Sequence, residues 1–127
     1  MENGKESRSS FARYCDIALG SAENGHASGF CVVEEKHLNP WGSCHGGLAF
    51  TLMDTVAGAA LLSLNLEKVY VTVSSSISYL RPIYPGRAEC TAEVVKCGRK
   101  IAFVDAEIHD EAGKILSRAS FEFCCTE

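Results

Sequence analysis

The amino-acid sequence predicts an α+β fold in which a curved antiparallel β-sheet wraps around one long central helix. Residues 48–62 form an apolar run of helical length, interrupted only by Thr51, Asp54, Thr55 and Gly58. Four segments of alternating apolar and polar residues follow this run, and turns rich in glycine or proline separate them. A chain of 127 residues with 46% hydrophobic content fits one domain, with no internal repeat or linker.

Two elements are expected before the long helix. A short helix is predicted near residues 10–19, and a strand is predicted over residues 26–36. The first nine residues are polar and are expected to be disordered. We therefore expect a single domain over residues 1–127, with its ordered part starting near residue 10.

The long helix is expected to be buried on most sides, because its apolar residues fall on every face. Residues 48–62 are fewer than the roughly 20 apolar residues that cross a bilayer, so no membrane helix is predicted. The sheet must therefore wrap around this helix.

Four strands are expected after the helix, because apolar and polar residues alternate with a period of two. The apolar faces of these strands are, in chain order, Val69, Val71, Val73, Ile77 and Tyr79; Ala88, Cys90, Ala92 and Val94; Ala102, Val104, Ala106 and Ile108; and Ile115, Ala119, Phe121 and Phe123.

The composition excludes several classes of protein. A net charge of -4 argues against a nucleic acid as the partner, since phosphate binding needs a clustered positive surface. The seven cysteines form no CxxC motif, and residues 1–10 lack the apolar core of a signal peptide. We therefore expect reduced thiols in a cytoplasmic protein. His26, His37 and His109 show no ligand spacing, so no metal site is predicted.

Residues 39–54 read NPWGSCHGGLAFTLMD and carry most of the chemical information in the chain. His45, Gly46 and Gly47 lie where a helix is expected to begin, so their backbone N–H groups and the helix dipole can bind a carbonyl oxygen or an oxyanion. Asp54 follows within the apolar run, where an unpaired carboxylate is costly enough to suggest a function. Cys44 precedes His45, but adjacency in sequence does not make a catalytic pair.

Over residues 11–123 the chain resembles the hotdog-fold acyl-CoA thioesterases, and within them the PaaI-like type of the phenylacetic-acid pathway. The resemblance rests on Asn39, Gly42, the His45-Gly46-Gly47 turn and Asp54, and on the segment of residues 78–82, which reads SYLRP. It implies hydrolysis of an acyl-CoA thioester by a dimer or a dimer of dimers. Coenzyme A belongs to the substrate in this reaction, and no cofactor is expected.

In the expected mechanism the Gly46 N–H, helped by Gly47, stabilises negative charge on the thioester oxygen. Asp54 attacks the carbonyl carbon or deprotonates a water molecule, and the sequence leaves both options open. The resemblance assigns the hydroxyl that holds this water to Thr72, with Ser74 or Ser75 as substitutes. It also implies that Asn39 orients the water or the thioester, and that His45 braces the loop and contributes weakly.

The spacing of Gly46 and Asp54 adds a constraint. Eight residues of helix separate the two along the axis by about 12 Å and rotate them by roughly 80°. One thioester cannot lie within reach of both, so we expect a two-fold dimer in which each site combines residues of two chains. Cationic side chains are expected near the phosphates of coenzyme A, and the candidates are Arg81, Arg87, Lys96, Arg99 and Lys100, with the turn at residues 98–100 favoured.

Each assignment has a structural alternative. Asp54 can be a paired buried carboxylate, the two glycines can serve close packing, and Asn39 and His45 can brace the loop. Three other functions compete with this one. An α/β-hydrolase needs a GxSxG motif, which the chain lacks. A hotdog dehydratase or hydratase shares the fold but places its acid and histidine differently, and an acyl-CoA-binding protein without turnover would not need Asp54.

Overall fold

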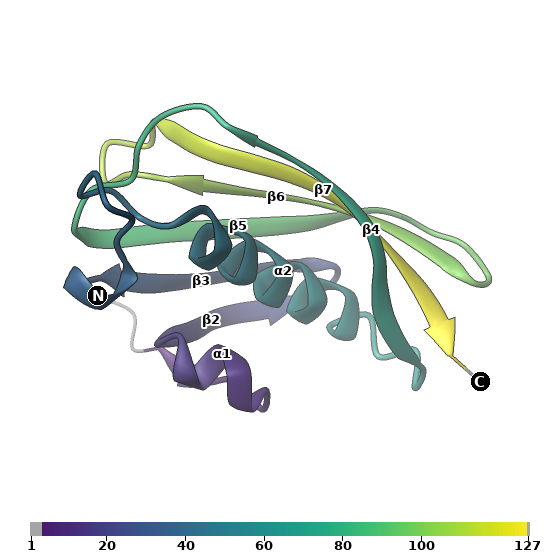
Figure 1. Ribbon diagram of the computed structural model, residues 1–127. Helices are drawn as coiled ribbons and strands as arrows, with labels where there is room; N and C mark the ends of the chain where they lie inside the picture. The colour runs from purple at the N-terminus through teal and green to yellow at the C-terminus, as the bar shows by residue number, and fades with distance from the viewer. Residues whose placement is uncertain (1–3, 127) are drawn as a thin grey trace.

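The computed structural model describes residues 4–126. Its elements, in chain order, are β1 (Lys5–Glu6), α1 (Ser10–Tyr14), β2 (Ile17–Glu23), β3 (His26–Val33), the 3₁₀-helix η1 (Glu35–His37), α2 (Gly46–Leu62), β4 (Val69–Tyr79), β5 (Gly86–Cys97), β6 (Ile101–His109) and β7 (Ile115–Thr126). The strands form one antiparallel sheet in the order β1-β2-β3-β5-β6-β7-β4, and α2 lies across one of its faces (Figure 1). The predicted α+β architecture is confirmed.

The amino-terminal part differs from the prediction. α1 ends at Tyr14, and residues 17–23, predicted to lie partly in a helix, form a strand that pairs with β3. β3 ends at Val33, and η1 replaces the end of the predicted strand. Of the nine residues expected to be disordered, residues 1–3 lie outside the described part, whereas Lys5–Glu6 pair with β2. The last four strands were all predicted.

The core lies between α2 and the sheet. α2 packs mainly against β3, β5 and β6, and it contributes Leu52, Met53 and Val56, each at most 2% exposed. The buried residues of the sheet are mostly small, so the helix can pack closely against it. These small residues are Ala88, Cys90, Ala92, Ala102, Ala106 and Ala119.

One face of α2 stays open, which corrects the expectation that the chain buries the helix on most sides. Thr51, Asp54 and Thr55 are only partly buried, and Leu62 is 53% exposed. The physical reason is that a single sheet covers a single side of the helix. The open face carries Asp54 and therefore belongs to the candidate site.

The strand β4 also differs from the prediction. Val69, Val71 and Val73 were assigned to a buried face, but they are 63%, 46% and 54% exposed. A register shift between Thr72 and Ser74 marks a β-bulge, which changes the residues that face the helix. Thr72, opposite the buried Phe123, faces α2, whereas Ser74 lies opposite the exposed Glu122 on the outer face.

Candidate functional site

The helix α2 begins at Gly46 with an N-cap that His45 supplies. Nδ1 of His45 accepts a hydrogen bond of 2.8 Å from the N–H of Gly47, and the N–H groups of Leu48 and Ala49 bond to the His45 carbonyl oxygen. Among the described residues, Gly46 is the one residue of this first turn whose N–H has no acceptor. The Gly47 N–H, expected to assist at the site, is therefore occupied by the cap, and Gly46 offers the available donor.

Tyr79, at the end of β4, packs directly on Gly46. Its hydroxyl donates a hydrogen bond of 2.9 Å to the Gly46 carbonyl oxygen. A Cβ atom at position 46 would lie 3.1 Å from both Cζ and Oη of Tyr79, so glycine permits this close approach. From the sequence, Tyr79 is expected on an apolar strand face and within the family-like segment of residues 78–82, and no local pattern predicts its contact with Gly46.

Asp54 lies in the middle of α2, on its open face. Its Oδ1 atom accepts a hydrogen bond of 2.7 Å from the Thr72 hydroxyl of β4. Burial raises the pKa of the Asp54 carboxyl above its ordinary value, and the Thr72 hydrogen bond opposes part of that effect. The structure therefore joins the predicted acid to the predicted hydroxyl within one chain.

Asn39 shapes the loop that precedes α2. Its Oδ1 accepts hydrogen bonds from the N–H groups of Trp41 and Ser43, and its Nδ2 donates to the Ser43 hydroxyl. Gly42 completes this turn with a φ of +87°. These contacts favour the loop-bracing alternative for Asn39, and they leave one Nδ2 hydrogen free to orient a water molecule or substrate.

The predicted substrate-binding residues are spread over the molecule. Arg81 donates to the Ile115 carbonyl oxygen at 2.8 Å, so part of its guanidinium anchors a loop. Arg99 and Lys100 lie at the turn between β5 and β6. Ser74 faces away from α2 because of the β-bulge, so within one chain it cannot replace Thr72 beside Asp54. That expectation is corrected.

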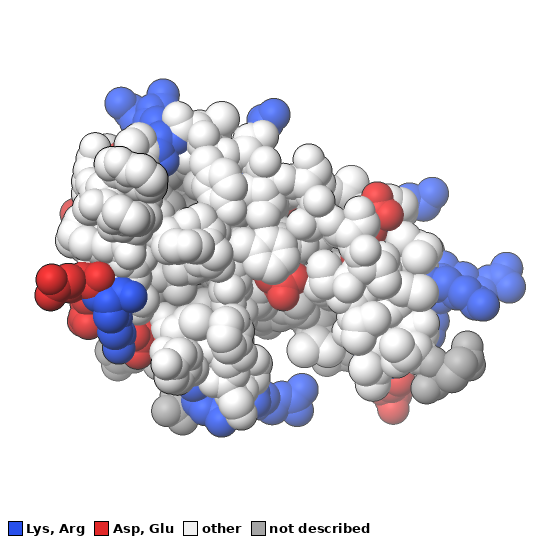
Figure 2. Space-filling view, in the orientation of Figure 1, with Lys and Arg blue, Asp and Glu red and all other residues white. Residues whose placement is uncertain are grey.

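Charged groups are unevenly distributed over the helix-bearing face. Figure 2 shows a largely uncharged middle of this face with Lys and Arg side chains around its rim, and one group of them lies at the edge where Figure 1 places the turn between β5 and β6. This distribution suits a ligand with an apolar part and a negatively charged end.

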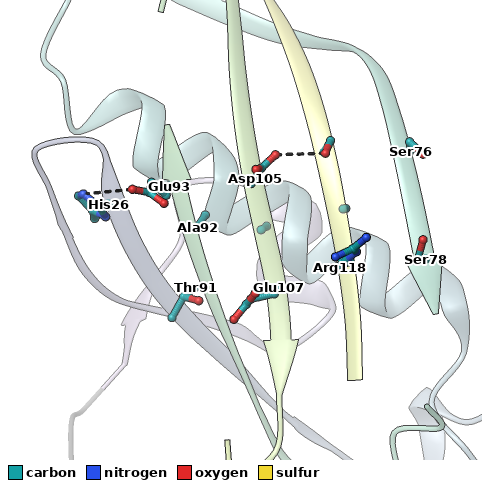
Figure 3. A pocket seen from close by; sticks show the side chains of 12 residues that line it. His26, Ser76, Ser78, Thr91, Ala92, Glu93, Asp105, Glu107 and Arg118 are labelled. Atoms are coloured by element: carbon teal, nitrogen blue, oxygen red, sulfur yellow. Dashed lines mark hydrogen bonds and ion pairs between the residues drawn. The ribbon is translucent and has the colours of Figure 1, made fainter. Parts of the chain in front are cut away.

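A pocket of about 640 Å³ lies on the opposite face of the sheet (Figure 3). Side chains of Thr91, Glu93, Asp105, Glu107 and Arg118 line it. It contains none of the predicted site residues. The candidate site lies apart from this pocket, beside the partly exposed residues of α2.

The structure does not favour a cysteine nucleophile, a metal site or a membrane-spanning helix in the described part of the chain. The Cys44 thiol contacts the backbone carbonyl of His45, and burial raises its pKa to about 11, which disfavours a nucleophilic thiolate. Among residues 4–126 no group of three or more His, Cys, Asp or Glu side chains is arranged to hold a metal ion. Within the same described part, no helix is long and apolar enough to span a membrane.

The site is divided into two halves within one chain. Gly46, with His45 and Tyr79, lies at the start of α2. Asp54 lies eight residues further along this helix, where Thr72 of β4 contacts it. Eight helical residues correspond to about 12 Å along the axis. One half offers a free N–H donor and the other a carboxylate of raised pKa, which together are the groups that acyl transfer requires.

Known proteins resemble this chain in sequence and in fold. Residues 42–117 match the thioesterase superfamily. The chain is 36% identical over 104 residues to human acyl-coenzyme A thioesterase 13, covering 80% of this chain and 74% of the relative. It is 33% identical over 108 residues to the acyl-coenzyme A thioesterase PaaI of Escherichia coli, covering 81% and 76%.

Solved structures of known proteins have the same fold. The E. coli PaaI protein superposes with a TM-score of 0.88 at 27% identity, covering 94% of this chain and 86% of that one. A protein of Streptococcus pneumoniae described as a hypothetical thioesterase and solved with coenzyme A superposes with a TM-score of 0.80 at 30% identity, covering 87% of this chain and 85% of that one. The chain therefore belongs to the thioesterase superfamily, as a hotdog-fold thioesterase of the PaaI type.

Proposed function

We propose that this protein hydrolyses an acyl-coenzyme A thioester to the free acid and coenzyme A. The observation that carries the proposal is the hydrogen-bonded pair of Asp54 and Thr72 on the open face of α2. A desolvated carboxylate of raised pKa is more basic than an ordinary one, which suits a general base or a nucleophile. The names of the relatives and the coenzyme A in the S. pneumoniae structure support the substrate class.

In the proposed reaction the Gly46 N–H donates to the thioester carbonyl oxygen and stabilises its negative charge in the transition state. Asp54 takes a proton from water, whose oxygen bonds to the carbonyl carbon as the carbon–sulfur bond breaks. The proton then passes to the leaving thiolate. Alternatively, Asp54 attacks the carbon itself, the carbon–sulfur bond breaks and the coenzyme A thiolate leaves; water then hydrolyses the mixed anhydride to the free acid and Asp54, and a proton of that water passes to the thiolate. Both routes use only side chains, the backbone and water, without a cofactor.

Thr72 has a defined part in either route. Its hydroxyl hydrogen is donated to Asp54 Oδ1, so the lone pairs of its oxygen remain free to accept a hydrogen bond from the attacking water. Oδ2 of Asp54 remains free to receive the proton. Asn39 and His45 hold the loop before α2, and the second Nδ2 hydrogen of Asn39 can orient the water or the thioester.

The proposed site combines two subunits. β4 is the outermost strand of the sheet, so among the described residues no strand pairs with its free edge. Val69, Val71 and Val73 on β4 are about half exposed or more. A long edge strand with exposed apolar side chains is a template for pairing with a second copy of the chain.

The pairing that completes the site can be specified. Antiparallel association of two β4 strands about an axis near Ser75 and Ser76 brings Thr72 opposite the partner's Tyr79. Because Thr72 contacts Asp54 and Tyr79 contacts Gly46 within each chain, the two half-sites then meet. The same antiparallel arrangement moves the partner's Gly46 toward the basic turn at residues 98–100.

The acyl group is proposed to be an aryl or medium-chain group, and the protein is proposed to act in the cytoplasm. The deciding experiment is a thiol-release assay on the purified protein with aryl-CoA and short-, medium- and long-chain acyl-CoA esters. We expect turnover with the aryl or medium-chain esters, and a loss of roughly 10²-fold or more in Asp54→Asn.

The matched control for that variant is Asp110→Asn, which changes a carboxylate in the turn after β6 and should retain activity. Tight binding of acyl-CoA without turnover would instead indicate a binding protein. Hydration or dehydration of an enoyl or hydroxyacyl ester without thiol release would indicate the dehydratase alternative.

A further inference from the structure

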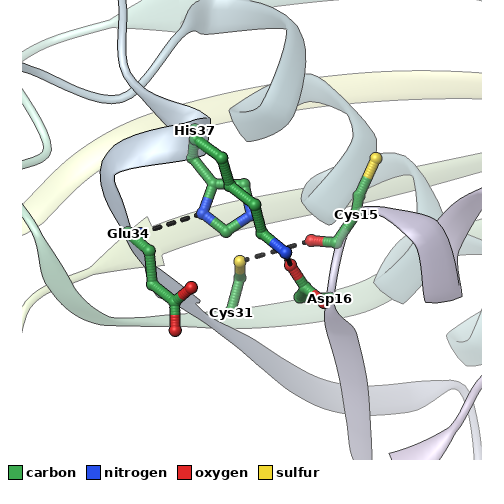
Figure 4. A network of polar contacts seen from close by, with 6 residues as sticks. Cys15, Asp16, Cys31, Glu34 and His37 are labelled. Carbon is green, nitrogen blue, oxygen red and sulfur yellow. Dashed lines mark hydrogen bonds and ion pairs between the residues drawn. The ribbon is translucent and has the colours of Figure 1, made fainter.

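A polar network lies between the amino-terminal segment and the loop that leads to α2 (Figure 4). Asp16 follows α1 with a φ of 62°, in the left-handed region that favours glycine. Its Oδ2 atom lies 3.1 Å from Nε2 of His37 and 2.8 Å from Nζ of Lys36. A non-glycine residue is held in this conformation when its surroundings compensate the strain, and here two polar contacts do so.

The contacts of His37 fix its tautomer. Nδ1 accepts a hydrogen bond of 2.9 Å from the N–H of Glu34, so this nitrogen carries no proton. The proton is therefore on Nε2, which donates it to Asp16. The His37 residue is 8% exposed, and both ring nitrogens are engaged. The ring is thus held in a single orientation.

The backbone of His37 connects this network to the catalytic helix. Its carbonyl oxygen accepts a hydrogen bond of 2.8 Å from the N–H of His45. His45 precedes Gly46, and its own side chain caps α2. The Gly46 N–H belongs to the peptide group between His45 and Gly46, so the direction of that N–H depends on where His45 is held.

We propose that Asp16 and His37 are positioning residues for thioester hydrolysis, which act by fixing the His45–Gly46 peptide that donates to the substrate oxygen. This inference rests on the proposed function. Neither residue contacts the substrate. Asp16 reaches the loop from a different part of the chain, and its carboxylate holds the His37 ring, whose backbone holds His45.

The test uses Asp16→Gly, which removes the carboxylate and at the same time supplies the residue best suited to a positive φ. Glycine relieves the strain of the positive φ, which offsets part of the cost of leaving the buried His37 ring without its acceptor, so this variant is expected to fold with a melting temperature near or slightly below that of the parent. We expect kcat to fall about tenfold, with KM within threefold of the parent, because the oxyanion donor is misplaced while the binding surface is kept. Asp16→Asn retains an acceptor for His37 and should recover most of the activity.

Lys36→Gln is the matched control. The Lys36 side chain is the other partner of Asp16 and is 60% exposed. Its replacement should leave kcat unchanged, because an exposed ion pair contributes little. If Lys36→Gln lowers kcat as much as Asp16→Gly does, the ion pair rather than the His37 contact is responsible, and the proposal is wrong.

Amide hydrogen exchange measured by mass spectrometry gives a readout that is independent of activity. Peptides covering residues 37–47 should exchange faster in Asp16→Gly than in the parent, while peptides from β6 and β7 keep their rates. Unchanged exchange and unchanged kcat in the folded variant would overturn the positioning role. A parent protein without thioesterase activity would defeat the proposed function, while the exchange result would still decide whether Asp16 holds the loop.

Discussion

The hydroxyl of Thr72 donates a hydrogen bond of 2.7 Å to Oδ1 of Asp54 and so joins the edge strand β4 to the middle of α2. Two opposing effects act on this carboxyl. Burial raises its pKa, and the donated hydrogen bond lowers it, with burial the larger effect. The Asp54 carboxylate is therefore more basic than an exposed one, and its basicity is adjusted by one identifiable neighbour.

Replacing Thr72 by valine should move the pH dependence of the reaction. Thr72→Val keeps the shape of the side chain but removes the donor, so the pKa of Asp54 should rise further. Because Asp54 must be ionised to act, the acidic limb of the kcat/KM profile should shift to higher pH. Thr72→Ser keeps the hydroxyl and should retain the parent profile. If the acidic limbs of the Thr72→Val variant and the parent coincide, Asp54 is not the group whose ionisation controls the profile.

Replacing Asp54 by asparagine should stabilise the fold at neutral pH. The folded-state pKa of Asp54 is raised, so the folded protein binds more protons than the unfolded chain between the two pKa values, and stability falls as pH rises through the folded pKa. Asparagine avoids this cost. We expect a melting temperature higher by on the order of a few °C at pH 7. The gain should disappear near pH 4, around the unfolded pKa of about 3.9. A lower melting temperature at pH 7 would show that the carboxylate stabilises the fold.

The fold was largely predictable because its main elements carry strong periodic signals. The apolar run before Leu62 and the alternating strands that follow are long and consistent. β2 was missed because residues 17–23, which read IALGSAE, mix small and polar residues without clear alternation. The exposed face of β4 was misassigned because a single bulged residue, Val73, reverses the alternation, and no sequence rule locates such a bulge.

The sequence predicted the site residues that lie together in one short motif, but not the contacts between distant parts of the chain. Gly46 and Asp54 lie in one motif, and Thr72 was reached through the family resemblance. The contacts of Tyr79 with Gly46 and of Asp16 with His37 join residues far apart in the chain. They depend on how the loops close, which local patterns do not encode. The β-bulge at Val73 also turns Ser74 away from α2, and the sequence pattern does not show this.

The contact of Tyr79 with Gly46 gives a third prediction. Tyr79→Phe keeps the ring against Gly46 but removes the hydrogen bond to the Gly46 carbonyl oxygen. A net hydrogen bond is worth about 1 kcal/mol, so kcat should fall about fivefold if the bond helps to position the start of the helix. Tyr84→Phe is the control, because Tyr84 is 65% exposed and its hydroxyl has no partner among residues 4–126. Steady-state kinetics with equal effects in both variants would remove Tyr79 from the site.

The basic turn between β5 and β6 gives a fourth prediction. Replacing Arg99 and Lys100 by glutamine should raise KM for the acyl-CoA ester roughly three- to tenfold and leave kcat nearly unchanged, because the phosphates lie far from the reacting bond. Rising salt should weaken coenzyme A binding in the parent and have less effect in this variant. Lys114→Gln, in the turn before β7, is the control for a loss of surface charge. A KM equal to that of the parent would exclude this turn from the phosphate site.

The proposed two-subunit site gives the last prediction, which combines two variants that are each expected to be inactive. Gly46→Pro removes the N–H donor at a position that proline favours in helices, and His45, with φ -61° and ψ 137°, already has the extended conformation that precedes proline. The added ring also presses on Tyr79, which belongs to the same half-site, so both effects disable that half-site and leave Asp54 of the same chain intact. The second variant is Asp54→Asn. When the two chains are unfolded and refolded together, random pairing makes about half of the dimers mixed. In a mixed dimer, one site has the intact Asp54 of the Gly46→Pro chain and the intact Gly46 of the Asp54→Asn chain, whereas the other site carries both substitutions. Activity should return to about a quarter of the parent value. If mass spectrometry confirms mixed dimers and activity still equals the sum of the two variants, each site is built within one chain, and the pairing through β4 does not complete it.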